Sequence, residues 1–224
     1  MEFDTYIEYL LNNNDVIYID TSSVMFTKEF KGFIECNRDK FIKMNKRITI
    51  TREVCLEIIK HYMSTIEEKH NKAKIVLSIM KQFQEIFIIE GDTFNTEEIQ
   101  KAFADSELLA RITKTKPQYR QLLITNDKNL SIDVDSLNGL NSCKGKKIMV
   151  CYIDENGNLN RGKTANKQQV KSDLNSVSSS ESNETQLEED KVSQKKFAFS
   201  KVLRIFLCGT GVFSLGVIAG KYVK

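Results

Sequence analysis

The stretch VIYIDTSS, residues 16–23, decides the fold of this chain. Its first four residues are β-branched or aromatic and follow an Asn-rich turn, which is typical of a buried β-strand. The run ends at Asp20, and the hydroxyl residues Thr21, Ser22 and Ser23 then offer N-caps for a helix. A strand that leads directly into a helix predicts the first unit of a parallel α/β sheet.

The same alternation of strands and helices continues along the chain. Further strands are expected at 47–51, 85–89 and 121–125, and a hairpin is expected to join 147–153 to 158–159 across Asn156 and Gly157. Helices are expected at 24–44, after Thr51, at 72–83 and from Thr93 or Asn95 to the residue before Pro117, and 130–140 is predicted to be a short helix or loop. The pattern predicts an α/β fold with a mostly parallel sheet flanked by helices.

Composition divides the chain into three parts. The overall content of 41% hydrophobic and 28% charged residues is typical of a globular protein. A polar segment such as VSSSESNETQLEED, however, has too few aliphatic side chains to offset the entropy lost when it is ordered. We therefore predict a domain at 1–160, a flexible polar linker at 161–200 and a single hydrophobic helix at 201–224.

Charge and cysteine content exclude several classes of protein. A net charge of +3 does not create the strong basic field that by itself indicates nucleic-acid binding. The five cysteines are odd in number and form no C-x-x-C, which argues against a disulfide scaffold and a zinc site. The N-terminus is acidic and has no signal-peptide pattern. We therefore expect the domain in a reducing compartment.

Three acids occur where a parallel sheet brings side chains together. Asp20 and Asp127 each end a predicted strand, and Asp105 lies on the intervening helix. Because the ligand crevice of an open parallel sheet lies beyond the carboxyl ends of its strands, we expect these acids to meet in one pocket. Carboxylate oxygens are the ligands that Mg²⁺ and Mn²⁺ prefer, so the sequence predicts a site for one of these cations.

A fourth acid is expected from the helix that follows Thr51. Glu53 and Glu57 lie one helical turn apart and can face the same direction. Like charges at this spacing are mildly destabilising, and a nearby cation would compensate for that repulsion. Spacing alone leaves both glutamates open as candidates.

The acid-containing strings, in their order along the chain, resemble the motifs of the PIN-domain family of metal-dependent ribonucleases. VIYIDTSS resembles the first strand of that family, ADSELLA its D-x-x-(I/L)-x-A helix motif, and LLITND its strand that ends in T-x-D. The resemblance covers roughly residues 16–153 and implies a Rossmann-like sheet. Thr51 stands where the family has a proline, and the family spacing from that position favours Glu57 over Glu53.

The resemblance also implies a function. The implied metal ligands, which are also the implied catalytic residues, are Asp20, Glu57, Asp105 and Asp127. Ser22 and Thr125 are implied hydrogen-bond donors behind them. The implied reaction is endonucleolytic cleavage of single-stranded RNA by a water that Mg²⁺ or Mn²⁺ activates. The alternatives are a catalytically silent PIN-like module that recruits RNA or protein to a membrane, and a toxin-type ribonuclease restrained by an antitoxin-like inhibitor.

Other polar side chains are weaker candidates for a functional role. Lys114, Lys116 and Arg120 lie between Asp105 and Asp127 in the chain, so they are the first candidates for RNA contact, although such groups usually serve solubility. His61 lies one turn after Glu57, where a solvent-facing or structural role is the more common one.

Residues 202–223 form an apolar stretch long enough, as a helix, to cross a hydrocarbon core of about 30 Å. The basic residues on its linker side outnumber those beyond it: Lys195, Lys196, Lys201 and Arg204 against Lys221 and Lys224. This asymmetry predicts a single-pass C-terminal membrane anchor with the domain in the cytoplasm. Gly216 and Gly220 have the spacing of close helix pairs, which suggests a homo-oligomer. The alternative is a buried or interfacial amphipathic helix.

Overall fold

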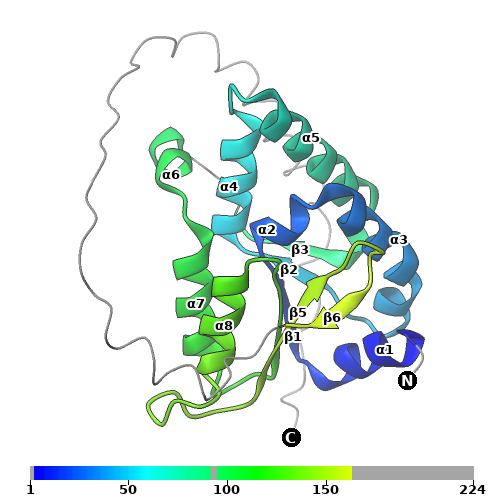
Figure 1. The fold of residues 1–224 in the computed structure, drawn as a ribbon, viewed down its shortest axis with the longest axis vertical. Helices are drawn as coiled ribbons and strands as arrows, with labels where there is room; N and C mark the ends of the chain where they lie inside the picture. Colours follow the sequence, from blue (N-terminus) through cyan, green and yellow to red (C-terminus); the bar gives the residue numbers. More distant parts are fainter. Residues whose placement is uncertain (1–2, 92–94, 163–224) are drawn as a thin grey trace, which may run out of the picture. The chain divides into compact units, whose positions relative to one another are not determined.

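The computed structural model describes residues 3–91 and 95–162, which form a sheet with helices on both faces (Figure 1). The predicted linker, beyond residue 162, and the predicted C-terminal helix lie outside the described residues. No helix within the described ranges is long and apolar enough to span a membrane.

The described strands form one six-stranded sheet of order β3-β2-β1-β4-β5-β6. Their bounds are Val16–Ile19 (β1), Ile48–Ile50 (β2), Phe87–Ile89 (β3), Gln121–Ile124 (β4), Ile148–Ile153 (β5) and Leu159–Arg161 (β6). The first five strands are parallel, and β6 is antiparallel to β5. The prediction of a mostly parallel α/β sheet is therefore confirmed, and the expected hairpin is its one antiparallel pair among the described strands.

Apart from α1, which precedes β1, the described helices lie between strands in the chain. Their bounds are Phe3–Asn13 (α1), Thr21–Val24 (α2), Thr27–Lys43 (α3), Arg52–Tyr62 (α4), Glu67–Gln82 (α5), Thr96–Lys101 (α6), Ala104–Thr115 (α7) and Lys128–Ser136 (α8), with a short 3₁₀ helix at Gln84–Ile86. Helices α7 and α8 pack beside each other on one face of the sheet, and α1 and α3 lie on the other (Figure 1). This double cover explains why the central strands are continuous apolar runs rather than alternating ones.

The direction of the strand order reverses between β1 and β4. The chain passes from β1 to β2 on one side, and from β4 to β5 on the other. Ile19 is paired with Ile124, so both strands end at the same level, and the Asp20 N–H donates to the Ile124 carbonyl at 2.9 Å. Such a reversal leaves a crevice beyond the carboxyl ends of the two strands. Asp20 and Asp127 follow these two ends.

The predicted single helix between Asn95 and Pro117 is wrong, because the chain breaks at Ala102 and Phe103 and forms α6 and α7. Side chains of α4 satisfy the backbone groups at this break: Lys60 donates to the Ala102 carbonyl at 3.3 Å, and Glu57 accepts from the Ala104 N–H at 3.0 Å. Phe103, at this break, is 61% exposed. The break turns the N-terminus of α7 toward α4.

The helices near the N-terminus also differ from expectation. The single helix expected at 24–44 is divided at Met25 and Phe26, and α2 begins before it. Asp20, rather than one of the three hydroxyl residues, is the N-cap of α2. Helix α1 is not among the helices expected from the sequence.

The β5–β6 turn depends on Gly157. This residue has a φ of 77°, and a Cβ built there would lie 2.9 Å from the Phe33 backbone nitrogen and 3.2 Å from the Glu29 carbonyl oxygen of α3. The turn therefore tolerates no side chain, both because of its φ and because of its close approach to a helix.

We expect Gly157→Ala to lower the free energy of unfolding by at least about 1 kcal/mol, measured by chemical denaturation. Gly139→Ala is the matched control, because a Cβ there meets only an ordinary contact at 3.6 Å. Equal stability of the two variants would contradict the packing described for the turn.

Candidate functional site

Asp20 lies directly after β1, and only one of its two carboxylate oxygens accepts hydrogen bonds from described residues. Its Oδ2 accepts hydrogen bonds from the Ser22 N–H at 3.1 Å, from the Ser22 hydroxyl at 2.5 Å and from the Thr125 hydroxyl at 3.1 Å. The residue is 1% exposed, and its Oδ1 is buried without a hydrogen-bond partner among the described residues. Burial raises the pKa of Asp20 in spite of these hydrogen bonds. A buried carboxylate oxygen without a donor among the described residues is costly.

Ser22 joins the ends of the two central strands. Its hydroxyl donates to Asp20 and accepts from the backbone N–H groups of Asn126 at 3.1 Å and Asp127 at 3.0 Å. The Thr125 hydroxyl makes a similar pair of contacts, since it donates to Asp20 and accepts from the Asp127 N–H at 3.0 Å. Both predicted supporting residues therefore lie behind Asp20 and fix its position relative to Asp127.

Asp127 follows β4 and caps α8. Its Oδ1 accepts from the N–H groups of Asn129 at 2.7 Å and Leu130 at 2.9 Å, which are free donors at a helix start. Its Oδ2 makes no hydrogen bond with the described residues. The cap thus uses one oxygen and leaves the other for a ligand.

Asp105 and Glu57 come from two helices that meet beside Asp20. Asp105 is the second residue of α7, and Glu57 on α4 binds the first N–H of α7 through Oε1. Burial and the negative charges of Asp20, Asp127 and Glu57 raise the pKa of Asp105 to about 6. The four acids therefore share one electrostatic environment.

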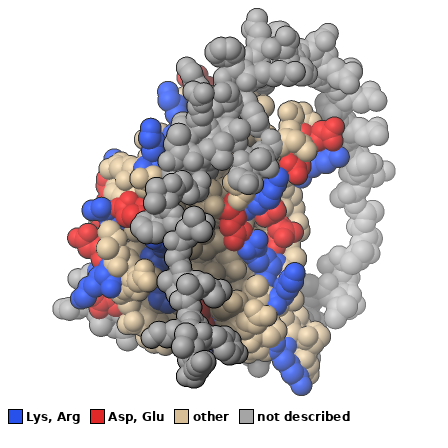
Figure 2. Space-filling view, turned by 180° about the vertical axis from the view of Figure 1, so that it is seen from behind, with Lys and Arg blue, Asp and Glu red and all other residues tan. Residues whose placement is uncertain are grey.

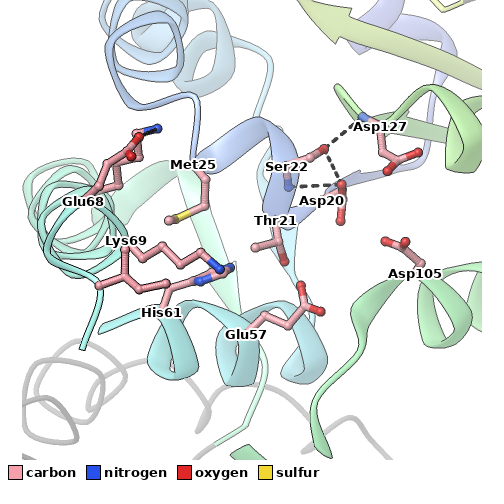
Figure 3. Close-up of a pocket in the computed structure, with 12 residues that line it drawn as sticks. Asp20, Thr21, Ser22, Met25, Glu57, His61, Glu68, Lys69, Asp105 and Asp127 are labelled. Carbon is pink, nitrogen blue, oxygen red and sulfur yellow. Dashed lines mark hydrogen bonds and ion pairs between the residues drawn. The ribbon is translucent and has the colours of Figure 1, made fainter. Parts of the chain in front are cut away.

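The four predicted acids line a single cleft of about 400 Å³. Figure 3 shows the carboxylates of Glu57 and Asp105 pointing toward Asp20, with Asp127 beside Ser22. The remaining lining residues are Thr21, Ser22, Met25, His61, Ile66, Glu68, Lys69 and Lys72. Glu53 does not line this cleft, so of the two glutamates that spacing left open, the fold brings Glu57 to the other acids.

The four acids offer carboxylate oxygens, which are the ligand type that a hard divalent cation prefers, and the Oδ1 of Asp20 is one of these oxygens without a hydrogen-bond partner among the described residues. Within residues 3–91 and 95–162, no three acidic, histidine or cysteine side chains are gathered closely enough to form a ready-made metal site. The acids surround a shared space without closing into a coordination shell.

The predicted RNA-contact group does not lie at the cleft. Lys116 is 3% exposed and donates to the Cys143 carbonyl at 2.7 Å, so the expectation of RNA contact is wrong for this residue. Arg120 precedes β4 and pairs with Asp15 at 3.2 Å, at the opposite edge of the sheet from Asp127. Lys114 is in the last turn of α7, far along the helix from Asp105.

Two residues at the strand ends were not among the predicted site residues. Asn126 accepts from the Ser23 hydroxyl at 2.8 Å and donates to the Ile153 carbonyl at 2.8 Å, which ties α2, β4 and β5 together. The Thr21 hydroxyl is buried without a hydrogen-bond partner in the described structure and lines the cleft. The sequence signal that could have identified Asn126 and Thr21 is their position directly beside Asp127 and Asp20.

Comparison of the chain with protein-family models, curated proteins and solved structures finds no match.

We expect Asp105→Asn to stabilise the metal-free protein above pH 6. A folded-state pKa raised from 3.8 to about 6 means that ionised Asp105 opposes folding above pH 6, and that this effect is absent below pH 3.8. After allowance for solvent screening, the expected gain is about 1 kcal/mol, or about 3 °C in melting temperature.

Thermal denaturation in EDTA at two pH values, one above 7 and one below 3.8, tests this expectation. The exposed Asp133 of α8 supplies the matched control, Asp133→Asn, which should leave the melting temperature unchanged. Destabilisation by Asp105→Asn above pH 7, or an equal gain at both pH values, would show that the acids do not repel one another.

Proposed function

We propose that this protein is a metal-dependent endoribonuclease that cleaves single-stranded RNA, with Mg²⁺ or Mn²⁺ held by Asp20, Glu57, Asp105 and Asp127. We also propose that residues 202–223 tether it to a membrane with the catalytic domain in the cytoplasm. The observation that carries the nuclease proposal is the buried, unpaired Oδ1 of Asp20 in a cleft that three further acids line, at the reversal of the strand order.

The acid cluster is costly to the metal-free fold. Burial and mutual repulsion oppose the ionisation of Asp20 and Asp105. Such a cost is typical of a functional site, because a structural role would be served equally well by neutral side chains. A divalent cation removes the repulsion and supplies a partner for the orphaned oxygen.

The proposed reaction assigns separate tasks to the cation and the chain. A divalent cation bound to such carboxylates lowers the pKa of water and offsets the charge that develops on a phosphodiester. Ser22 and Thr125 hold Asp20 in a fixed orientation, and the helix-start N–H groups do the same for Asp127. RNA as the substrate is supported by the resemblance of the three motifs to PIN-domain ribonucleases.

One observation favours a second function, that of a catalytically silent module which binds RNA or protein. Glu57 and Asp127 each use one oxygen to cap a helix, so both acids have a structural role without any metal. These caps account for the presence of Glu57 and Asp127 without a metal. They do not explain the unpaired oxygen of Asp20 or the position of Asp105, and the nuclease remains the better account.

The decisive variants are Asp20→Asn and Asp127→Asn. Asparagine also caps helices, so both variants are expected to fold. With Mn²⁺ or Mg²⁺, we expect each to cleave single-stranded RNA at least about 100-fold more slowly than the full-length wild-type chain. Glu53→Gln is the matched control, because it removes the same charge from the same helix as Glu57 but outside the cleft, and it should retain wild-type activity.

Two results would overturn the nuclease proposal. One is a wild-type chain that leaves single-stranded RNA intact with either cation, and the other is equal cleavage by the wild type and Asp20→Asn. If the wild type and Asp20→Asn bind RNA with equal affinity and neither cleaves it, the result would support the silent module instead.

A further inference from the structure

The cleft extends beyond the acids onto the α4–α5 corner. Its far end is lined by His61 of α4, by Lys69 and Lys72 of α5, and by the apolar side chains of Met25 and Ile66. One end of the cleft is therefore strongly negative, and the other combines cationic and apolar groups. A polar imidazole lies between them, one helical turn from Glu57.

Lys69 differs from the other lysine at this end. Lys72 forms an ion pair with Glu68 at 2.7 Å, so its charge is compensated. Lys69 is exposed and forms no ion pair with any described residue. Figure 3 shows the side chain of Lys69 extending toward the acidic end of the cleft, as does that of His61. The cleft thus contains one uncompensated ammonium group among the residues that the structure describes.

His61 has unused hydrogen-bonding capacity. It is half-buried, and neither ring nitrogen has a hydrogen-bond partner in the described part of the chain. Burial and the positive charge of Lys69 lower the pKa of His61, and the negative charge of Glu57 opposes this shift. An imidazole N–H donates a hydrogen bond, which suits a phosphate oxygen beside Lys69.

On the part of the surface that Figure 2 leaves uncovered, Lys and Arg occur together with Asp and Glu. Backbone phosphates are bound chiefly by lysine and arginine, and Lys69 places such a group inside the cleft.

On the basis of the proposed function, we infer that Lys69 and His61 form a phosphate subsite for the backbone phosphate next to the one that is cleaved. The substrate is then an extended polynucleotide strand that runs from the acids along the α4–α5 corner, rather than a single nucleotide. Met25 and Ile66 supply apolar surface beside this path, where a base can pack.

Salt dependence of binding tests the subsite without requiring cleavage. The full-length chain is titrated into a fluorescent oligouridine of about twelve nucleotides in EDTA, at a series of salt concentrations, with fluorescence anisotropy as the readout. For single strands each lost phosphate contact reduces the slope of log K against log salt by about 0.7. We expect this reduction for Lys69→Ala, and a restored slope for Lys69→Arg.

Lys74→Ala is the matched control. Lys74 is also exposed and unpaired within the described residues of α5, but it does not line the cleft, so its loss should leave the slope at the wild-type value. Equal slopes for Lys69→Ala and the wild type, or no binding of the oligomer by the wild type at low salt, would overturn the subsite.

The two proposals fail in different ways. Cleavage that depends on Asp20, with a slope that Lys69→Ala leaves unchanged, would retain the nuclease and overturn the subsite. A slope that falls in Lys69→Ala, in a chain that does not cleave, would retain the phosphate contact and overturn the nuclease.

Discussion

The structure depends on the buried carboxylate of Asp20 at the junction of β1 and β4. Three donors converge on one of its oxygens, and two of them, the hydroxyls of Ser22 and Thr125, also accept the backbone N–H of Asp127. One acid is thereby fixed relative to a second across the reversal of the strand order. The other oxygen of Asp20 remains unpaired in the described structure. The hydrogen bonds that hold the Asp20 carboxylate at this sheet edge therefore all use Oδ2 and leave Oδ1 without a partner among the described residues.

The rest of the cleft follows from this constraint. The break between α6 and α7 allows α7 to begin beside α4, and the Glu57 bond to Ala104 holds Asp105 near the two strand ends. Burial and repulsion from the neighbouring acids raise the pKa of Asp105, and the α4–α5 corner places the uncompensated charge of Lys69 at the other end of the same cleft. The proposed binding of a polyanionic strand rests on this arrangement of an acidic centre at one end of the cleft and one uncompensated lysine at the other.

Local sequence patterns predicted the strands and the convergence of the acids, because a parallel sheet brings strand ends together whatever the helices do. The sequence did not reveal the break at Ala102 and Phe103, which depends on side chains of α4 that are distant in the chain. It also failed for Lys116, whose burial is set by the Cys143 carbonyl, and for Lys69, which enters the cleft only because α4 and α5 pack together. Tertiary contacts determine these positions, and local sequence patterns do not reveal such contacts.

The most direct test of the central claim is the binding of Mn²⁺ to the full-length chain, measured from the electron paramagnetic resonance signal of the free ion. The unpaired oxygen of Asp20, in a cleft that three further carboxylates line, predicts binding in the wild type and in Glu53→Gln, and its loss or a marked weakening in Asp20→Asn. If Asp20→Asn binds Mn²⁺ as tightly as the wild type, the unpaired oxygen is not a metal ligand and the account of the cleft is contradicted.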